Sequence, residues 1–164
     1  TKLITGYDQP ALGGVYKLSA VRSEGGEWVH KVKLSEQSIK ISNPGIQQVR
    51  RYYTATENIG DAIYDVDTNL SGGCTIVDPM DPTRMKKISA DVRYRDLLVP
   101  VFRNGQCVYN IPTIEETRSL AAQELTGFHY GVKRFVNPHA YPVGLEKSLH
   151  TLKTELVLKA RGVK

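Results

Sequence analysis

Thr113-Ile114-Glu115-Glu116 marks the place where the sequence pattern changes, and the fold class depends on that change. Thr and Glu three positions apart form a capping box, in which each side chain binds the other residue's backbone N–H at a helix start. Apolar residues then recur at helical spacing, and Gly127 can close this first helix. A second helix is predicted farther on, with one apolar face formed by Leu145, Leu149, Leu152 and Leu156.

Before this point, short apolar or alternating stretches lie between turn residues, which is typical of strands. Residues 23–26 are expected to form a hairpin loop, and Asn104-Gly105 a two-residue hairpin turn, because both residues tolerate positive φ. Pro100 cannot donate to a ladder, so its strand is expected to be an edge or to break there. The expected strands are 15–21, 28–34, 49–53, 62–66, 74–77, 97–102 and 107–111.

Many strands followed by two helices predict an α+β fold with a mainly antiparallel sheet. The 164 residues amount to one domain or a little more, which is enough to bury a core without disulfide or metal support. No run of eighteen apolar residues is present, so we expect no membrane span, and no secretory signal is visible. Because the chain begins at Thr1 rather than Met, we expect a removed segment upstream or a fragment.

Cysteine usage and charge exclude several functions. Cys74 and Cys107 lie far apart without a CxxC or Cys/His cluster, so we expect no metal site but two partly buried, unreactive thiols in a reducing, cytoplasmic compartment. The net charge of +5 is spread along the chain. None of its densest clusters is flanked by the interleaved aromatics and glycines of a nucleic-acid module, so we expect most of this charge to be solvated surface, with no nucleic-acid partner. These clusters are Lys86-Lys87, Arg50-Arg51 and Lys31/Lys33.

Four pieces of the chain are similar, in order, to nicotinate phosphoribosyltransferases. The opening piece reads Thr1-Lys2-Leu3-Ile4-Thr5-Gly6-Tyr7-Asp8-Gln9-Pro10-Ala11-Leu12-Gly13-Gly14-Val15-Tyr16-Lys17-Leu18, and the last reads Lys133-Arg134-Phe135-Val136-Asn137-Pro138-His139-Ala140-Tyr141-Pro142-Val143-Gly144-Leu145. The two middle pieces are Lys33-Leu34-Ser35-Glu36 with Asn43-Pro44-Gly45 and Val49-Arg50-Arg51, and Leu97-Leu98-Val99-Pro100-Val101-Phe102 with Asn104-Gly105. The resemblance covers nearly the whole chain and is weak over residues 54–87.

The resemblance implies the C-terminal part of an irregular α/β barrel enzyme that also has an open α/β domain built from both chain ends. Residues 1–18 would be the end of the barrel phosphate loop and the strand after it, and residues 19–164 the C-terminal α+β domain. Family members join nicotinate to phosphoribosyl pyrophosphate and yield nicotinate mononucleotide for NAD biosynthesis. ATP hydrolysis drives the step through a phosphorylated histidine, Mg is expected with phosphoribosyl pyrophosphate, and the enzymes act as cytoplasmic homodimers.

Little of the family's active site is expected in this chain. Thr1 occupies the threonine place of a Gly-x-Gly-Thr loop that holds the phosphate of the ribose substrate, and Lys2 and Lys17 are weaker candidates for that phosphate. The catalytic histidine lies upstream in the family, so the isolated chain, without a catalytic residue or bound cofactor, is expected to be catalytically silent. None of the four histidines here can be matched to the phospho-accepting histidine of the family: His30, His129, His139 and His150.

Three further expectations concern packing. His139 and Tyr141 are expected to pack the crossing segment onto the sheet. Relatives commonly show Ser where this chain has Glu146, and Glu is expected to lose the helix cap while still complementing the helix dipole. If the open domain is shared between chain ends, the isolated piece is expected to expose an apolar face and self-associate.

Two alternatives remain open at this stage. One is a related phosphoribosyltransferase for another pyridine base, nicotinamide or quinolinate, because the residues that select the base lie upstream in the family. The other is a non-catalytic binding module that shares this sheet.

Overall fold

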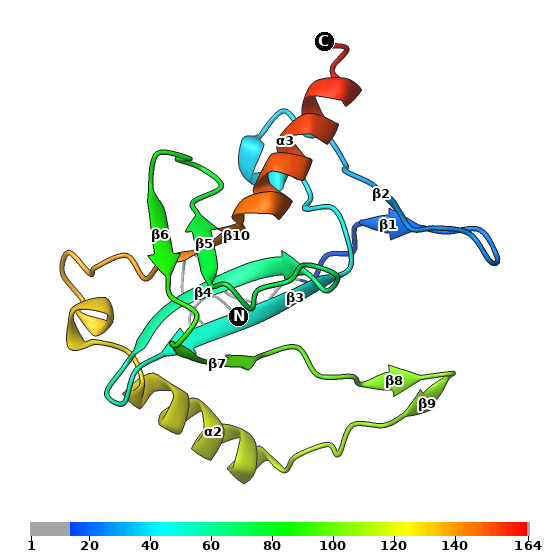
Figure 1. The fold of residues 1–164 in the computed structure, drawn as a ribbon. Helices are drawn as coiled ribbons and strands as arrows, with labels where there is room; N and C mark the ends of the chain where they lie inside the picture. Colours follow the sequence, from blue (N-terminus) through cyan, green and yellow to red (C-terminus); the bar gives the residue numbers. More distant parts are fainter. Residues whose placement is uncertain (1–13, 164) are drawn as a thin grey trace, which may run out of the picture.

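A computed structural model describes residues 14–163, and a curled six-stranded sheet forms its centre (Figure 1). The strand order is β6-β5-β10-β4-β3-β7, and every neighbouring pair is antiparallel except β10 and β4. The predicted α+β fold with a mainly antiparallel sheet is confirmed. The strands are β3 (Gln47–Tyr53), β4 (Asn58–Asp65), β5 (Cys74–Val77), β6 (Met85–Ile88), β7 (Arg93–Asp96) and β10 (Val143–Glu146).

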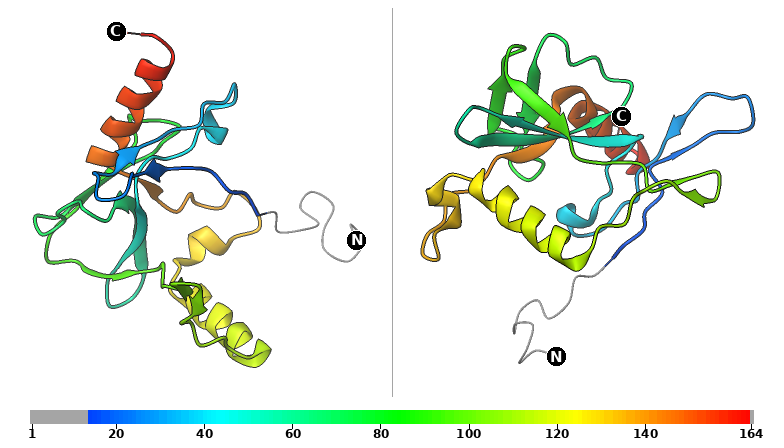
Figure 2. Two further views of the ribbon diagram at one scale, coloured as in Figure 1. Left: turned by 90° about the vertical axis from the view of Figure 1, so that its right-hand side faces the viewer. Right: turned by 90° about the horizontal axis from the view of Figure 1, so that it is seen from below.

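Two small hairpins stand apart from this sheet and project to the same side of it (Figures 1 and 2). One joins β1 (Ala20–Val21) to β2 (Val29–His30), and the other joins β8 (Phe102–Arg103) to β9 (Gln106–Cys107). The four strands predicted here were too long, because each has two residues. The turn prediction is confirmed, since Asn104 and Gly105 have φ of 49° and 77°. The strand after Pro100 begins only at Phe102, as a break at proline requires.

The first helix, α2 (Ile114–Thr126), begins as predicted. Thr113 accepts a hydrogen bond from the Glu116 backbone N–H, and the Glu116 carboxylate accepts one from the Thr113 N–H. Gly127 ends the helix, as expected, although its φ of −71° is not left-handed. No α2 residue is buried, so the local cap and not a packed face defines this helix. Short 3-10 turns lie at η1 (Ser38–Lys40) and η2 (Tyr130–Lys133).

The second helix, α3 (Lys147–Ala160), starts later than predicted. Leu145 lies in β10 and not on the helical stripe, and it is fully buried between β4 and β5. The expectation that Glu146 loses the helix cap is also wrong. Its carboxylate accepts hydrogen bonds from the backbone N–H groups of Ser148 at 2.7 Å and Leu149 at 3.3 Å. A glutamate side chain at the strand end thus reaches the same donors that a serine would.

The core lies where β10 enters the sheet between β4 and β5, with α3 packed beside it. Leu149 of α3 is buried against this region. Gly144 allows the close approach of β10 and β5, because a Cβ there would collide with the Val77 carbonyl. The buried cluster beside it consists of Tyr52, Ala62, Cys74, Ile76 and Ile88.

Three strands of the sheet were not predicted, namely β6, β7 and β10. The edge strands β6 and β7 are rich in lysine and arginine, so they lack the apolar alternation that indicates a strand. Charged edges are a common protection against pairing with another sheet. β10 was missed because its residue Leu145 was assigned to the apolar face of the second predicted helix.

Candidate functional site

Thr1 and Lys2, the predicted phosphate-binding residues, lie outside the described residues. Lys17 lies inside them, in an extended segment that belongs to no strand. Its ammonium group donates a hydrogen bond to the Lys40 carbonyl at 2.9 Å. Lys17 is therefore held against the 3-10 turn η1.

The segment 129–141 brings two of the four histidines together. The imidazole rings of His129 and His139 lie parallel, with their centroids 6.1 Å apart, and Nδ1 of His129 accepts a hydrogen bond from the Gly131 N–H. His139 is exposed, so the expectation that it packs onto the sheet is wrong. Tyr141 does contact the sheet: it is half-buried, and its hydroxyl donates a hydrogen bond to Asp61 of β4, while its ring stacks edge-on against Phe128.

Tyr141 belongs to a partly buried charged network centred on Arg51. Nε and Nη2 of Arg51 donate to the two carboxylate oxygens of Asp61 at 2.9 and 2.7 Å, and Nη1 donates to Glu124 Oε2 at 2.9 Å. The Tyr141 hydroxyl donates to Asp61 Oδ1 at 2.9 Å, and Arg95 also pairs with Glu124. The hydrogen bond to Asp61 raises the pKa of Arg51 above its ordinary value, and burial raises the pKa of Tyr141.

The geometry of this network indicates a structural role rather than a reactive site. Arg51 lies on β3, Asp61 on β4 and Glu124 on α2, so one guanidinium joins three elements. Each carboxylate of the network is already engaged, because Asp61 accepts from Arg51 and Tyr141, and Glu124 pairs with Arg51 and Arg95. The network therefore positions α2 against the sheet.

Arg50, the neighbour of Arg51 in β3, points to the other face of the sheet. Its guanidinium donates to Asp96 at 2.8 and 3.0 Å and lies 3.7 Å from the centre of the Tyr94 ring. The prediction that the Arg50-Arg51 cluster is solvated surface is wrong. Neither arrangement could be predicted from local sequence, because the acidic partners of Arg50 and Arg51 lie between 10 and 73 positions away along the chain.

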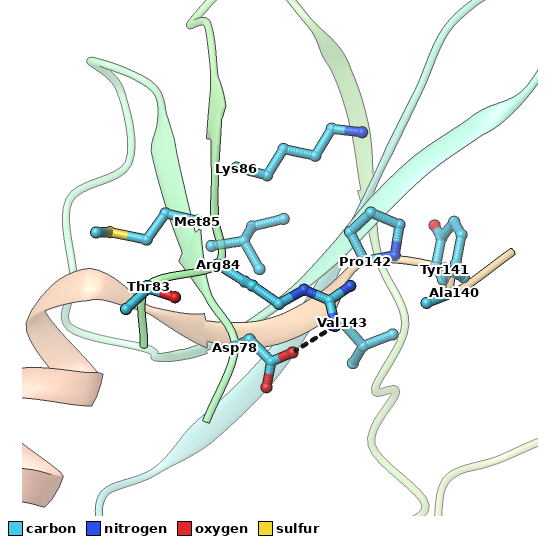
Figure 3. Close-up of a pocket in the computed structure, with 10 residues that line it drawn as sticks. Asp78, Thr83, Arg84, Met85, Lys86, Ala140, Tyr141, Pro142 and Val143 are labelled. Atoms are coloured by element: carbon cyan, nitrogen blue, oxygen red, sulfur yellow. Dashed lines mark ion pairs between the residues drawn. The ribbon is translucent and has the colours of Figure 1, made fainter. Parts of the chain in front are cut away.

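A cavity of about 490 Å³ opens between the β5–β6 hairpin and the segment 140–143 (Figure 3). Figure 3 shows Thr83 and Met85 on the hairpin side of this cavity and Tyr141 and Pro142 across from them. The polar groups in it already have partners. Arg84 forms a long ion pair of 3.9 Å with Asp78, and the Lys86 ammonium donates to the Ile59 carbonyl at 2.6 Å.

The lining of this cavity combines apolar and charged side chains. It includes no cysteine or histidine, and its carboxylate, Asp78, accepts a hydrogen bond from the Met80 backbone N–H at 2.8 Å. Across residues 14–163, no group of three or more His, Cys, Asp or Glu side chains could hold a metal ion. Over the same residues, no helix is long and apolar enough to cross a bilayer.

The two thiols differ in environment. Cys74 is buried in the core, and burial raises the pKa of its thiol, an environment in which a structural cysteine is expected to be unreactive. Cys107 is exposed in β9, so the expectation of partial burial is wrong for it. It lies in a hairpin with large apolar side chains on either side that face solvent in this structure.

Comparison with known proteins gives one consistent result. Residues 46–153 match the model of the nicotinate phosphoribosyltransferase C-terminal domain. The chain is 31% identical to the nicotinate phosphoribosyltransferase of Bacillus subtilis (strain 168) over 99% of its own length, and 29% identical to that of Rattus norvegicus over 99%. It spans only 34% and 29% of the lengths of those two relatives.

A solved structure resembles the fold. The crystal structure of human nicotinic acid phosphoribosyltransferase superimposes with a TM-score of 0.55 at 21% identity. The match covers 71% of this chain and 24% of the human chain. At that identity the similarity concerns the arrangement of the backbone alone.

Proposed function

We propose an activity for the whole protein from one premise: the chain belongs to the nicotinate phosphoribosyltransferase family and is the C-terminal domain of such an enzyme. The complete enzyme joins nicotinate to phosphoribosyl pyrophosphate, with ATP hydrolysis, and makes nicotinate mononucleotide for NAD biosynthesis. The observation that carries the proposal is the match over residues 46–153, together with relatives named for this activity that align with 99% of the chain.

The domain's own part in this activity is to position the substrate site rather than to react. The charged groups of the described cavity and of the Arg51 network are already engaged in ion pairs or hydrogen bonds with neighbouring residues. We place the reaction in the remaining two thirds of the enzyme and expect the isolated residues 1–164 to be inactive. A purified polypeptide of residues 1–164 that makes nicotinate mononucleotide would contradict this.

Thr1 has a proposed role at the border of the two parts. A threonine hydroxyl at the end of a phosphate loop can add one donor to the backbone N–H groups that surround the 5-phosphate. Binding energy from that remote group helps to orient the ribose for transfer. In the full-length enzyme, Thr1→Ala should raise the KM for phosphoribosyl pyrophosphate roughly tenfold, as the loss of one charge-assisted hydrogen bond predicts. Lys2→Ala should have a smaller effect.

The family resemblance also supports several proposals about the complete enzyme. ATP would be a co-substrate, Mg would accompany phosphoribosyl pyrophosphate, and the enzyme would be a cytoplasmic homodimer with a phosphorylated histidine. A related enzyme for another pyridine base is the second candidate, because the residues that choose the base are expected upstream. A non-catalytic module is disfavoured, since the aligned relatives carry the name of an enzyme.

The deciding experiment measures product formation by the full-length gene product. Phosphoribosyl pyrophosphate is supplied with nicotinate, nicotinamide or quinolinate, each with and without ATP. Nicotinate mononucleotide formed faster with ATP supports the proposal. Product formed only with nicotinamide or quinolinate, and not with nicotinate, would favour the related phosphoribosyltransferase. No product from any base would favour the binding module.

A further inference from the structure

The β8–β9 hairpin and its flanks, residues 97–112, form a segment with an unusual composition for an exposed position. We name it the apolar arm. Among its sixteen residues the sole charged side chain is Arg103. Seven of its large apolar side chains face solvent in this structure, with Phe102 at 66% and Ile111 at 77% exposure. The other five are Leu98, Val99, Val101, Val108 and Tyr109.

The arm is also poorly supported by the rest of the described chain. Within residues 14–163, β8 and β9 pair with each other and with no other strand. The arm is fastened at its root, where the Gln48 side chain exchanges hydrogen bonds of 2.9 and 3.0 Å with the backbone of Leu98. Beyond that root, the hairpin extends away from the sheet, and the chain after β9 returns to the start of α2 (Figure 1).

Physical chemistry argues against a free arm in water. An isolated two-stranded hairpin is at best marginally stable, and contiguous exposed apolar patches mark an interaction surface. The tip nevertheless has a well-defined turn, with Asn104 and Gly105 in the left-handed region. A defined hairpin with apolar sides and unpaired strand edges fits a partner that covers the side chains and adds backbone hydrogen bonds.

The exposed surface continues onto the segment that follows the arm. On α2, Ile114, Leu120 and Leu125 are more than half exposed, while Glu124 binds Arg51 and Arg95 on the sheet side. The polar contact with the sheet thus leaves these three apolar side chains mostly exposed among residues 14–163.

We infer that the apolar arm is the docking element for the preceding part of the same polypeptide, which covers Phe102, Val108, Tyr109 and Ile111 in the complete enzyme. This inference rests on the proposed function, because it takes the chain to be one domain of a longer enzyme. The relatives support that occupant, since this chain spans about a third of their length. A covalently tethered partner also has an effective concentration in the mM range, which a separate copy rarely reaches.

The two cysteines provide a direct test in the full-length gene product. Cys107 lies in the arm and is exposed here, whereas Cys74 lies in the core and serves as an internal control. With N-ethylmaleimide and peptide mass spectrometry, we expect native Cys107 to react at least ~100-fold more slowly than in denaturant, as a covered thiol should. Reaction of native Cys107 at the denatured rate would overturn the inference.

A photo-crosslink identifies the occupant. With p-benzoylphenylalanine in place of Tyr109, irradiation should give an adduct of monomer mass on a denaturing gel, joined to a peptide from the part before residue 1. An adduct of dimer mass would assign the arm to a second copy, and no adduct would leave it uncovered; either result overturns the inference. Because this readout needs no catalysis, it can succeed even if the enzyme makes no nicotinate mononucleotide.

A pair of matched variants tests whether the cover is energetically important. Phe102→Ser should lower the Tm of the full-length protein by several degrees, because it removes apolar area buried at the interface. Met80→Ser is the control, since Met80 is also about half exposed but lies in the β5–β6 turn outside the arm. Equal Tm values for the two variants would contradict a covered arm.

Discussion

Arg51 binds Asp61 through two parallel hydrogen bonds of 2.9 and 2.7 Å across strands β3 and β4. Both side chains are largely buried, at 12% and 8% exposure, and the pair continues to Glu124 of α2 and to Tyr141. A planar guanidinium matches a carboxylate in this two-point geometry, which lysine cannot reproduce. The relationship fixes how helix and crossing segment meet the sheet.

Arg51→Met should therefore be strongly destabilising. It leaves the buried Asp61 carboxylate without its cation, and breaking one side of a buried pair costs on the order of 3 kcal/mol. Native-state hydrogen exchange of β3 and β4 amides in the full-length protein measures the loss. Arg84→Met is the matched control, because the Arg84–Asp78 pair is 3.9 Å long and screened by solvent and should contribute little to stability. Similar losses for both variants would contradict a structural role for the network.

Glu146→Ala should weaken the start of α3. The substitution removes the carboxylate that accepts from the Ser148 and Leu149 N–H groups, and losing such a cap costs about 1 kcal/mol. Glu146→Ser should recover most of that loss, since a serine hydroxyl at the same position can accept from the same donors. Exchange rates of α3 amides distinguish the variants, and equal protection in all three proteins would show that the cap is unimportant.

Gly144→Ala should disturb the centre of the sheet. The added methyl group would meet the Val77 carbonyl on β5, which is backbone and cannot move aside as a flexible side chain could. Forced overpacking of this kind costs about 2 kcal/mol. Gly72→Ala is the control, because a Cβ at Gly72 enters open space. Urea midpoints followed by circular dichroism should fall for the first variant and stay within error for the second.

Acid should destabilise the sheet through Asp96. Hydrogen bonds from Arg50 hold the pKa of this carboxyl below its ordinary value of 3.8. Its contribution to stability is complete above that ordinary value and is lost as the pH falls through the lower pKa of the folded state. Asp96→Asn should therefore be less stable than the parent at pH 6 and should lose less of its remaining stability between pH 5 and pH 3.

The control for this pH dependence is Asp91→Asn, which changes an exposed carboxylate in the turn before β7. Its urea midpoint should follow the parent across the same pH range. If Asp96→Asn also followed the parent, the Arg50–Asp96 pair would carry no measurable linkage.

Local chemistry made part of the fold predictable. The capping box at Thr113 and Glu116 and the turn at Asn104-Gly105 involve residues at most three positions apart, so the sequence contains both partners. The order of strands and helices gave the α+β class, because the spacing of apolar residues within each stretch indicates its type of secondary structure. The strings resembling the family pointed to the C-terminal domain, and the family match over residues 46–153 confirmed it.

The candidate site was less predictable than the fold. Thr1 and Lys2 came from the resemblance and lie outside the described residues, so their role stays a prediction. The Arg51 network was missed because its partners, Asp61, Glu124 and Tyr141, are separated from it by 10 to 90 positions that no local pattern connects. A pair of arginines in a strand looks the same in sequence whether it is solvated or paired.

Sequence by itself determined the features whose partners lie within a few residues of one another. These are the start of α2, the hairpin turn at Asn104-Gly105, and the apolar face of α3 from Leu149 onward. Tertiary structure alone decided that Leu145 belongs to a strand, because β10 forms only when β4 and β5 offer it backbone partners. The same holds for Glu146, whose capping role depends on the strand ending where the helix begins. Backbone pairing and buried charge pairs are long-range interactions, and their energy exists only once the chain has brought the partners together.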